Sequence, residues 1–178
     1  MIRKHSLRRR RGQLSQTGVS LLETMIATVL LLIVSIGLLG VGLLATTTTE
    51  NQGHLAARTT EYAQDKMEQL LALAFSDPSS NTTVFPATIS GGSGLSVGGS
   101  SDPSAPVSQY VDYLDVNGNL LVAVGTTPAS GWFYKRVWQV STISSTLKQI
   151  TVTTIVASTN SRGQIPQSTV TALKTKPF

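Results

Sequence analysis

A single carboxylate, Glu23, stands at the start of an apolar run and is the residue best placed to do chemistry with another molecule. There is no charged residue between Thr24 and Thr49. Removing a carboxylate from water near the start of a membrane-length helix costs about 2.5–3.5 kcal/mol on insertion scales, so such residues are rare and usually functional. We therefore expect Glu23 to pair with a positive charge on a partner molecule.

The segment from Gly94 to Gly98 matches the G-x-S-x-G pattern of a hydrolase nucleophile. That motif requires a strand before the serine, a helix after it and a histidine base. The only histidines are His5, in the basic N-terminal arm, and His54, within a helical pattern. We therefore interpret the segment as a glycine- and serine-rich loop, and we expect no catalytic residue in the chain.

The segment Asp115–Asn119 places side-chain oxygens at alternate positions, as at the start of a calcium-binding loop. It lacks the glycine and the distal glutamate that complete such a loop. A hairpin turn at Asn117-Gly118 explains the same residues with fewer requirements. We expect the hairpin and keep calcium as the alternative. The chain has no cysteine and two separated histidines, so we expect no other metal site and no cofactor.

Aromatic residues alternate with Lys135 and Arg136 in the stretch WFYKRVWQV. This combination could stack on and neutralise single-stranded nucleic acid. The alternation has a period of two, however, which favours a strand whose aromatic face packs against a helix. The face predicted for the core carries Trp132, Tyr134, Trp138 and Val140.

The net charge of +5 belongs to the N-terminal arm. Six of the fourteen basic residues precede Gly18, and the remaining eight are matched by nine acidic residues, all beyond Gly18. Clustered lysines and arginines before an apolar helix favour a cytoplasmic N-terminus and a body outside the cytoplasm. The charge therefore indicates membrane topology more than nucleic-acid binding.

The segment Leu21–Leu44 is nearly all apolar and long enough to cross a bilayer, which requires about 20 residues. It exceeds a typical secretory h-region of about 7–15 residues and has no A-x-A site at its end, so we expect it to be retained.

From Glu50 to Phe75 there is no proline, and apolar residues recur at helical spacing. We predict one continuous helix with an amphipathic second half. Its predicted buried stripe is Leu55, Tyr62, Ala63, Met67, Leu70, Leu71 and Ala74.

Asp77-Pro78 ends this helix, and residues 76–108, rich in Ser, Gly, Pro and Thr, are predicted to form a loop. Strand-like runs follow at Gln109–Val116, Asn119–Val124, Trp132–Ser141, Leu147–Ala157 and Thr169–Leu173. Their short connections imply an antiparallel sheet. The predicted fold class is α+β, a long N-terminal helix packed on a four- or five-stranded antiparallel sheet.

The order of a basic leader, Gly18, Val19, Ser20-Leu21-Leu22, Glu23 and an apolar helix resembles the class III signal of type IV prepilins and type II secretion pseudopilins. The match covers about residues 12–45, and the order of helix, loop and sheet agrees over the rest of the chain. The stretch YAQDKMEQLLAL also resembles minor pilins of the PilV kind.

The resemblance implies that a prepilin peptidase cuts between Gly18 and Val19 and that the new amine of Val19 is N-methylated. Gly18 lacks a Cβ and can therefore lie close to a protease. Glu23 would neutralise the Val19 amine of a neighbouring subunit and set the axial register, because a buried charge must be paired. The implied segments are a leader (1–18), a membrane and filament-core helix (19–45), an amphipathic helix half (46–75), a loop (76–108) and a sheet domain (109–178).

Three departures from the family pattern are visible. Pilins usually have Phe in place of Val19, and many major pilins have a proline in place of Gly40. Gly37, Gly40 and Gly42 could soften the helix instead, because glycine lowers helix propensity, or could permit close helix packing. The paired C-terminal cysteines of many major pilins are absent, which favours a minor subunit.

We therefore expect a minor structural subunit of a type IV pilus. It would be a single-pass bacterial inner-membrane protein with a cytoplasmic N-terminus and an outer C-terminal domain, and later part of a pilus or pseudopilus. The expected partners are other pilins or pseudopilins, the prepilin peptidase and methylase, and the inner membrane, whereas a DNA or surface ligand has no support. Two alternatives stay open: a minor pseudopilin of a type II secretion system, and a membrane-anchored binding domain that never polymerises.

Overall fold

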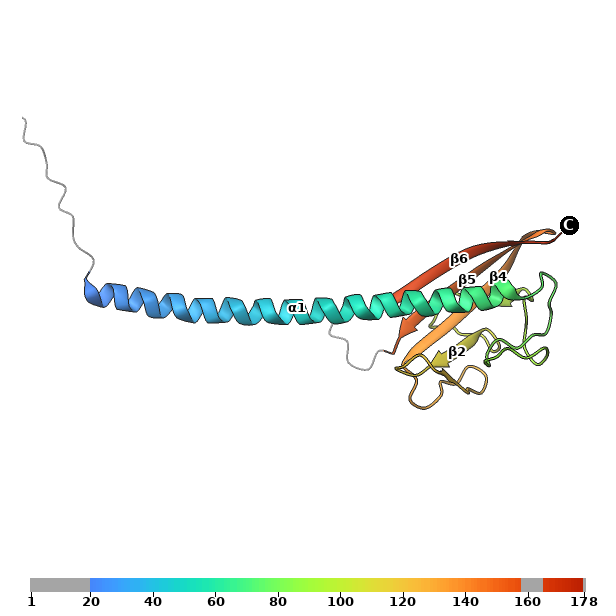
Figure 1. The fold of residues 1–178 in the computed structure, drawn as a ribbon, viewed down its shortest axis with the longest axis horizontal. Helices are drawn as coiled ribbons and strands as arrows, with labels where there is room; N and C mark the ends of the chain where they lie inside the picture. Colours follow the sequence, from blue (N-terminus) through green and yellow to red (C-terminus); the bar gives the residue numbers. More distant parts are fainter. Residues whose placement is uncertain (1–19, 158–164, 178) are drawn as a thin grey trace, which may run out of the picture. The chain divides into compact units, whose positions relative to one another are not determined.

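The computed structural model describes residues 20–157 and 165–177. The chain divides into two compact units, residues 1–47 and 48–178, and each is described by itself. One helix, α1 (Leu21–Ala72), contributes residues to both units. The strands belong to the second unit (Figure 1): β1 (Gly98–Gly99), β2 (Val111–Leu114), β3 (Leu120–Leu121), β4 (Tyr134–Ser144), β5 (Leu147–Val156) and β6 (Gln167–Thr175).

The strands form one antiparallel sheet in the order β3-β2-β4-β5-β6, and β1 pairs with β4 beyond the end of β2. The long strands β4, β5 and β6 lie side by side in Figure 1. The predicted α+β layout is thereby confirmed. The expected number of four or five strands is wrong, because Gly98–Gly99 pairs with β4 from within the predicted loop. Two glycines carry no side-chain pattern from which a strand could be predicted.

The second half of α1 packs on one face of the sheet through Ala63, Met67 and Leu70, all three of them buried. These residues belong to the predicted apolar stripe. Leu71 and Ala74 are exposed: Leu71 lies in the last turn of α1, and Ala74 lies beyond its end at Ala72. The sheet and the loop contribute the rest of this core: Leu95, Tyr110, Trp138, Val140, Ile150 and Val152.

The prediction that Trp132 shares a face with Trp138 is wrong. Trp132 packs against Tyr113 and Val137, with the rings of Trp132 and Tyr113 centred 5.7 Å apart. Val137 and Trp138 are consecutive strand residues and therefore point to opposite faces. The alternation fails at Trp132 because β4 begins only at Tyr134.

The segment 76–108, predicted to be a loop, packs against the core. Leu95 is completely buried in the main core. The Lys148 ammonium donates to the carbonyls of Phe75 and Leu95, each at 2.8 Å. The Asp77 carboxylate accepts the backbone N–H groups of Ser79 and Ser80, each at 3.0 Å. These bonds fix the start of the segment and its middle part around Leu95.

The substitution Gly99→Ala is expected to lower the free energy of unfolding by about 2–4 kcal/mol. Gly99 has a φ of +81°, and an added Cβ would overlap the Trp138 carbonyl oxygen and lie 2.7 Å from Cδ1 of Tyr110. Denaturant unfolding of the full chain in detergent micelles, followed by tryptophan fluorescence, measures the loss. The matched control is Gly91→Ala, because Gly91 has a φ of +95° with open space around it. It should cost only about 1 kcal/mol, and equal losses for the two variants would contradict the close approach at Gly99.

Candidate functional site

The structure describes the predicted N-terminal site only from Ser20 onward. Gly18 and Val19, the predicted cleavage and methylation positions, lie outside the described residues. The Ser20 hydroxyl oxygen accepts the Glu23 backbone N–H at 3.2 Å and caps α1. Glu23 is exposed in the first helical turn, where the helix dipole favours a negative charge. The spacing of Ser20 and Glu23 is that of a capping box, a signal that the sequence already contained.

The following helix segment offers an apolar surface on every side. All side chains from Leu21 to Leu44 are exposed. In the described part of the chain, α1 is long and apolar enough to cross a membrane by length and composition. Five of its hydroxyl groups donate to carbonyls three or four residues earlier at 2.7–3.3 Å, so these five need no water. The hydroxyls belong to Thr24, Thr28, Ser35, Thr46 and Thr47.

The three glycines predicted to soften the helix are all part of it. α1 continues through Gly37, Gly40 and Gly42, and a Cβ added at any of them would meet nothing within 4 Å. Within one chain these positions are therefore bare helix surface. Because they lack side chains, each position leaves room for another helix to approach closely.

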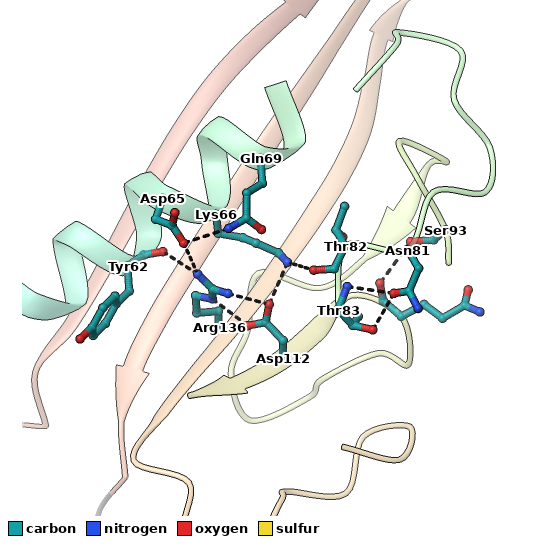
Figure 2. A network of polar contacts seen from close by, with 11 residues as sticks. Tyr62, Asp65, Lys66, Gln69, Asn81, Thr82, Thr83, Ser93, Asp112 and Arg136 are labelled. Carbon is teal, nitrogen blue, oxygen red and sulfur yellow. Dashed lines mark hydrogen bonds and ion pairs between the residues drawn. The ribbon is translucent and has the colours of Figure 1, made fainter. Parts of the chain in front are cut away.

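A charge cluster joins α1 to the sheet (Figure 2), in which Lys66, Asp112 and Arg136 are buried and Asp65 is exposed. Asp112, on β2, accepts from Nε of Arg136 at 2.7 Å and from Nζ of Lys66 at 2.8 Å. Lys66 also donates to the Thr82 carbonyl oxygen, and Arg136 reaches Asp65 at 2.8 Å. The cluster thus ties the helix to β2, β4 and the loop.

Two cations, Lys66 and Arg136, share the carboxylate of Asp112. All three residues are at most 2% exposed. Burial alone would raise the pKa of Asp112, but Arg136 and Lys66 outweigh it and hold that pKa below its usual value. Burial lowers the pKa of Lys66 to about 8, despite the attraction of Asp112. The Lys66 ammonium lies 4.1 Å from the centre of the Trp138 ring, which stabilises its charge further.

The lowered pKa of Lys66 predicts that stability rises with pH between about 8 and 10. In that window an unfolded lysine keeps its proton, whereas folded Lys66 releases it, so the unfolded state binds more protons. The complete shift corresponds to about 3 kcal/mol. Above pH 10 the raised pKa values of Tyr113 and Tyr134 oppose the gain.

Guanidinium titrations of the full chain at several pH values in this window measure the effect. The variant Lys66→Met should remove most of the increase. A wild-type profile that stays flat or falls from pH 8 to 10 would show that Lys66 does not titrate there.

The charge cluster is not evident from the sequence patterns. They allow Arg136 to be a nucleic-acid contact, yet Arg136 and Trp138 are buried and engaged inside the fold. Lys135 donates to the Pro103 carbonyl oxygen at 2.9 Å. The position of Arg136 between Tyr134 and Trp138 on a period-two strand was the available signal, because it places the guanidinium on the core face.

The other two candidate motifs are turns. The Asp115 carboxylate accepts the backbone N–H groups of Asn117 and Asn119, each at 2.8 Å, which fits the expected hairpin. Ser96 follows a turn rather than a strand, leads into β1 rather than a helix, and donates to the Pro78 carbonyl oxygen. Among the described residues, no group of three or more His, Cys, Asp or Glu side chains could hold a metal ion.

An open hollow of about 370 Å³ lies beside the charge cluster. Its polar lining includes Asp65, Gln69, Asn119 and Arg136, and the Phe85 side chain, which is largely exposed, lies beside it.

Comparisons with protein-family models, with curated proteins and with solved structures found no match to this chain.

Proposed function

We propose that the chain is a minor structural subunit of a type IV pilus, processed by a prepilin peptidase and assembled through its N-terminal helix. The observation that carries the proposal is the uncharged helix segment Leu21–Leu44, exposed on every side, with Glu23 in its first turn and a cluster of arginines before it. Such a surface is stable in a lipid bilayer or against identical helices, but not in water. Before assembly it would anchor the protein in the inner membrane.

The environment of Glu23 supports an assembly role. Its backbone N–H is already capped by Ser20, and its carboxylate is exposed in a segment that has no other charge. In a helix bundle without water, that carboxylate needs a cation from a neighbouring chain. The amine released by cleavage before Val19 would supply it.

Mass spectrometry of the N-terminus of the native protein tests the proposal. The expected result is a mature chain that begins at Val19 with a methylated amine. A native chain that retains its basic arm would overturn the proposal. Immunogold labelling of sheared surface fibres then distinguishes a pilus subunit from a minor pseudopilin of a type II secretion system, because only the former should label surface fibres.

The hollow beside the charge cluster favours a second function of another class, a membrane-anchored binding domain that does not polymerise. Its lining combines an aromatic ring with amide and carboxylate groups, which suits a small polar ligand. The same N-terminal measurement separates the two functions, because the anchor needs no cleavage at Val19.

A further inference from the structure

The outer edge of β6 is a long strand edge with little protection. β6 ends the sheet order, and among the described residues no strand pairs with its outer side. The strand has nine residues, contains no proline and no acid, and carries one charge, Lys174. Its pairing with β5 runs without a register shift, unlike that between β4 and β5. Proteins usually protect such edges with charges, prolines or bulges, because an open edge pairs with other chains.

The backbone groups that point outward from β6 follow from its pairing with β5. The N–H of Val156 donates to the Pro166 carbonyl oxygen, and that of Lys176 donates to the Thr146 carbonyl oxygen. Hydrogen-bonded pairs alternate along an antiparallel ladder, so the even-numbered residues of β6 bond to β5. The odd-numbered residues therefore direct N–H and C=O groups away from the sheet: Gln167, Thr169, Thr171, Leu173 and Thr175.

The surroundings of this edge fit an added strand. The even-numbered side chains of β6 face α1, since the Ser168 hydroxyl contacts that of Thr59 at 2.9 Å and Lys174 donates to the Leu71 carbonyl oxygen. A hollow of about 440 Å³ beside the start of β6 is lined by Ala56, Ile165 and neighbouring residues. Side chains of an incoming strand would have space there.

The charges near β6 indicate which charge a partner strand should carry. No aspartate or glutamate occurs from Val116 to Phe178. Lys176 is exposed just after β6, and Lys174, whose ammonium donates to the Leu71 carbonyl oxygen, adds a second positive charge near the end of the strand. We infer that the β6 edge pairs with an extended acidic segment of another protein, which adds a strand to the sheet. A second copy of this chain cannot supply such a segment from its own β6, because β6 contains no aspartate or glutamate. Antiparallel self-pairing would also turn residues 48–72 of the two copies in opposite directions, since β6 runs parallel to this part of α1.

This choice of partner rests in part on the proposed function, because all subunits of a helical filament share one direction. The test uses the full chain in detergent micelles and a synthetic peptide as long as β6, in which threonine and valine alternate between two terminal glutamates. Hydrogen exchange is measured at single amides. The peptide should slow exchange at Thr169, Thr171 and Leu173 by on the order of tenfold or more, and should leave Val170 and Ala172, already bonded to β5, unchanged.

Two variants sharpen the test. Thr171→Pro removes an outward N–H and should abolish the slowing at Thr169 and Leu173. Thr171→Val keeps that N–H and should preserve the slowing, although both variants lose the hydroxyl contact with Thr151 at 3.3 Å. A peptide with terminal lysines in place of the glutamates should bind at least several-fold more weakly.

Unchanged exchange at the odd-numbered amides under saturating peptide would overturn the inference. Slowing that grows with protein concentration in the absence of peptide would also overturn it, because it would identify a second copy as the partner. The measurement does not depend on cleavage at Val19, so its failure and the failure of the proposed function can be told apart.

Discussion

Replacing Asp112 with asparagine is expected to lower the free energy of unfolding by about 3–5 kcal/mol. The change removes the one fully buried anion of the charge cluster and leaves Lys66 and Arg136 in the interior without it. Arg136 stays charged and loses one of its two carboxylate partners, and Lys66 loses the carboxylate that favours its protonated form. The asparagine has almost the same volume, so the loss reports the charge and not a cavity.

Guanidinium unfolding of the full chain in detergent micelles measures this loss. Trp132 and Trp138 both lie in the second unit, so tryptophan fluorescence follows the unit that contains Asp112. The matched control is Asp65→Asn, which also removes a carboxylate bonded to Arg136. The Asp65 side chain is 55% exposed, and its loss should cost at most about 1 kcal/mol. Equal losses of unfolding free energy at the two positions would mean that burial does not determine how much each carboxylate stabilises the fold.

The helix and the long strands could be predicted because their sequence patterns are continuous. The uncharged run and the helical spacing of Ala63, Met67 and Leu70 predicted α1 to within a few residues at each end. The strand from Leu147 was predicted with nearly its observed bounds, because β-branched residues fill it. In these elements local preference and tertiary packing agree.

The charge cluster could not be predicted from such patterns, because a lysine in a helix or an aspartate in a short strand normally faces water. Lys66 lies three residues after Ala63 and four before Leu70, on the face that packs against the sheet. Asp112 lies in β2, which is covered on both faces. Only the tertiary structure brings these residues to the same place, so their pairing had no local signal.

The packing of the predicted loop, residues 76–108, had no signal in the sequence for a different reason. Glycine and serine in residues 76–108 suggested an irregular segment, but Gly99 allows the chain to lie against Tyr110 and Trp138 where any side chain would collide. Leu95 then enters the core from this segment. Composition describes what the backbone is free to do, whereas these contacts decide which conformation it adopts.

Replacing Glu23 with glutamine is expected to reduce incorporation of the chain into surface filaments by on the order of a hundredfold, if the helix assembles as proposed. The substitution removes the anion that would face the Val19 amine of a neighbouring chain in a bundle without water. An unpaired buried cation costs about 3 kcal/mol or more, which corresponds to this factor. The Ser20 cap uses the backbone N–H of residue 23, so glutamine should leave the start of α1 intact.

Quantitative immunoblots of sheared filaments and of membranes measure the effect. Membrane levels should stay near those of wild type, because the apolar segment that would insert is unchanged. Glu23→Asp keeps the charge one methylene further from its partner and should give an intermediate level. Glu68→Gln, which removes another exposed acid of α1, is the matched control and should assemble normally. Normal incorporation of the Glu23→Gln chain would mean that assembly does not depend on an ion pair at this position.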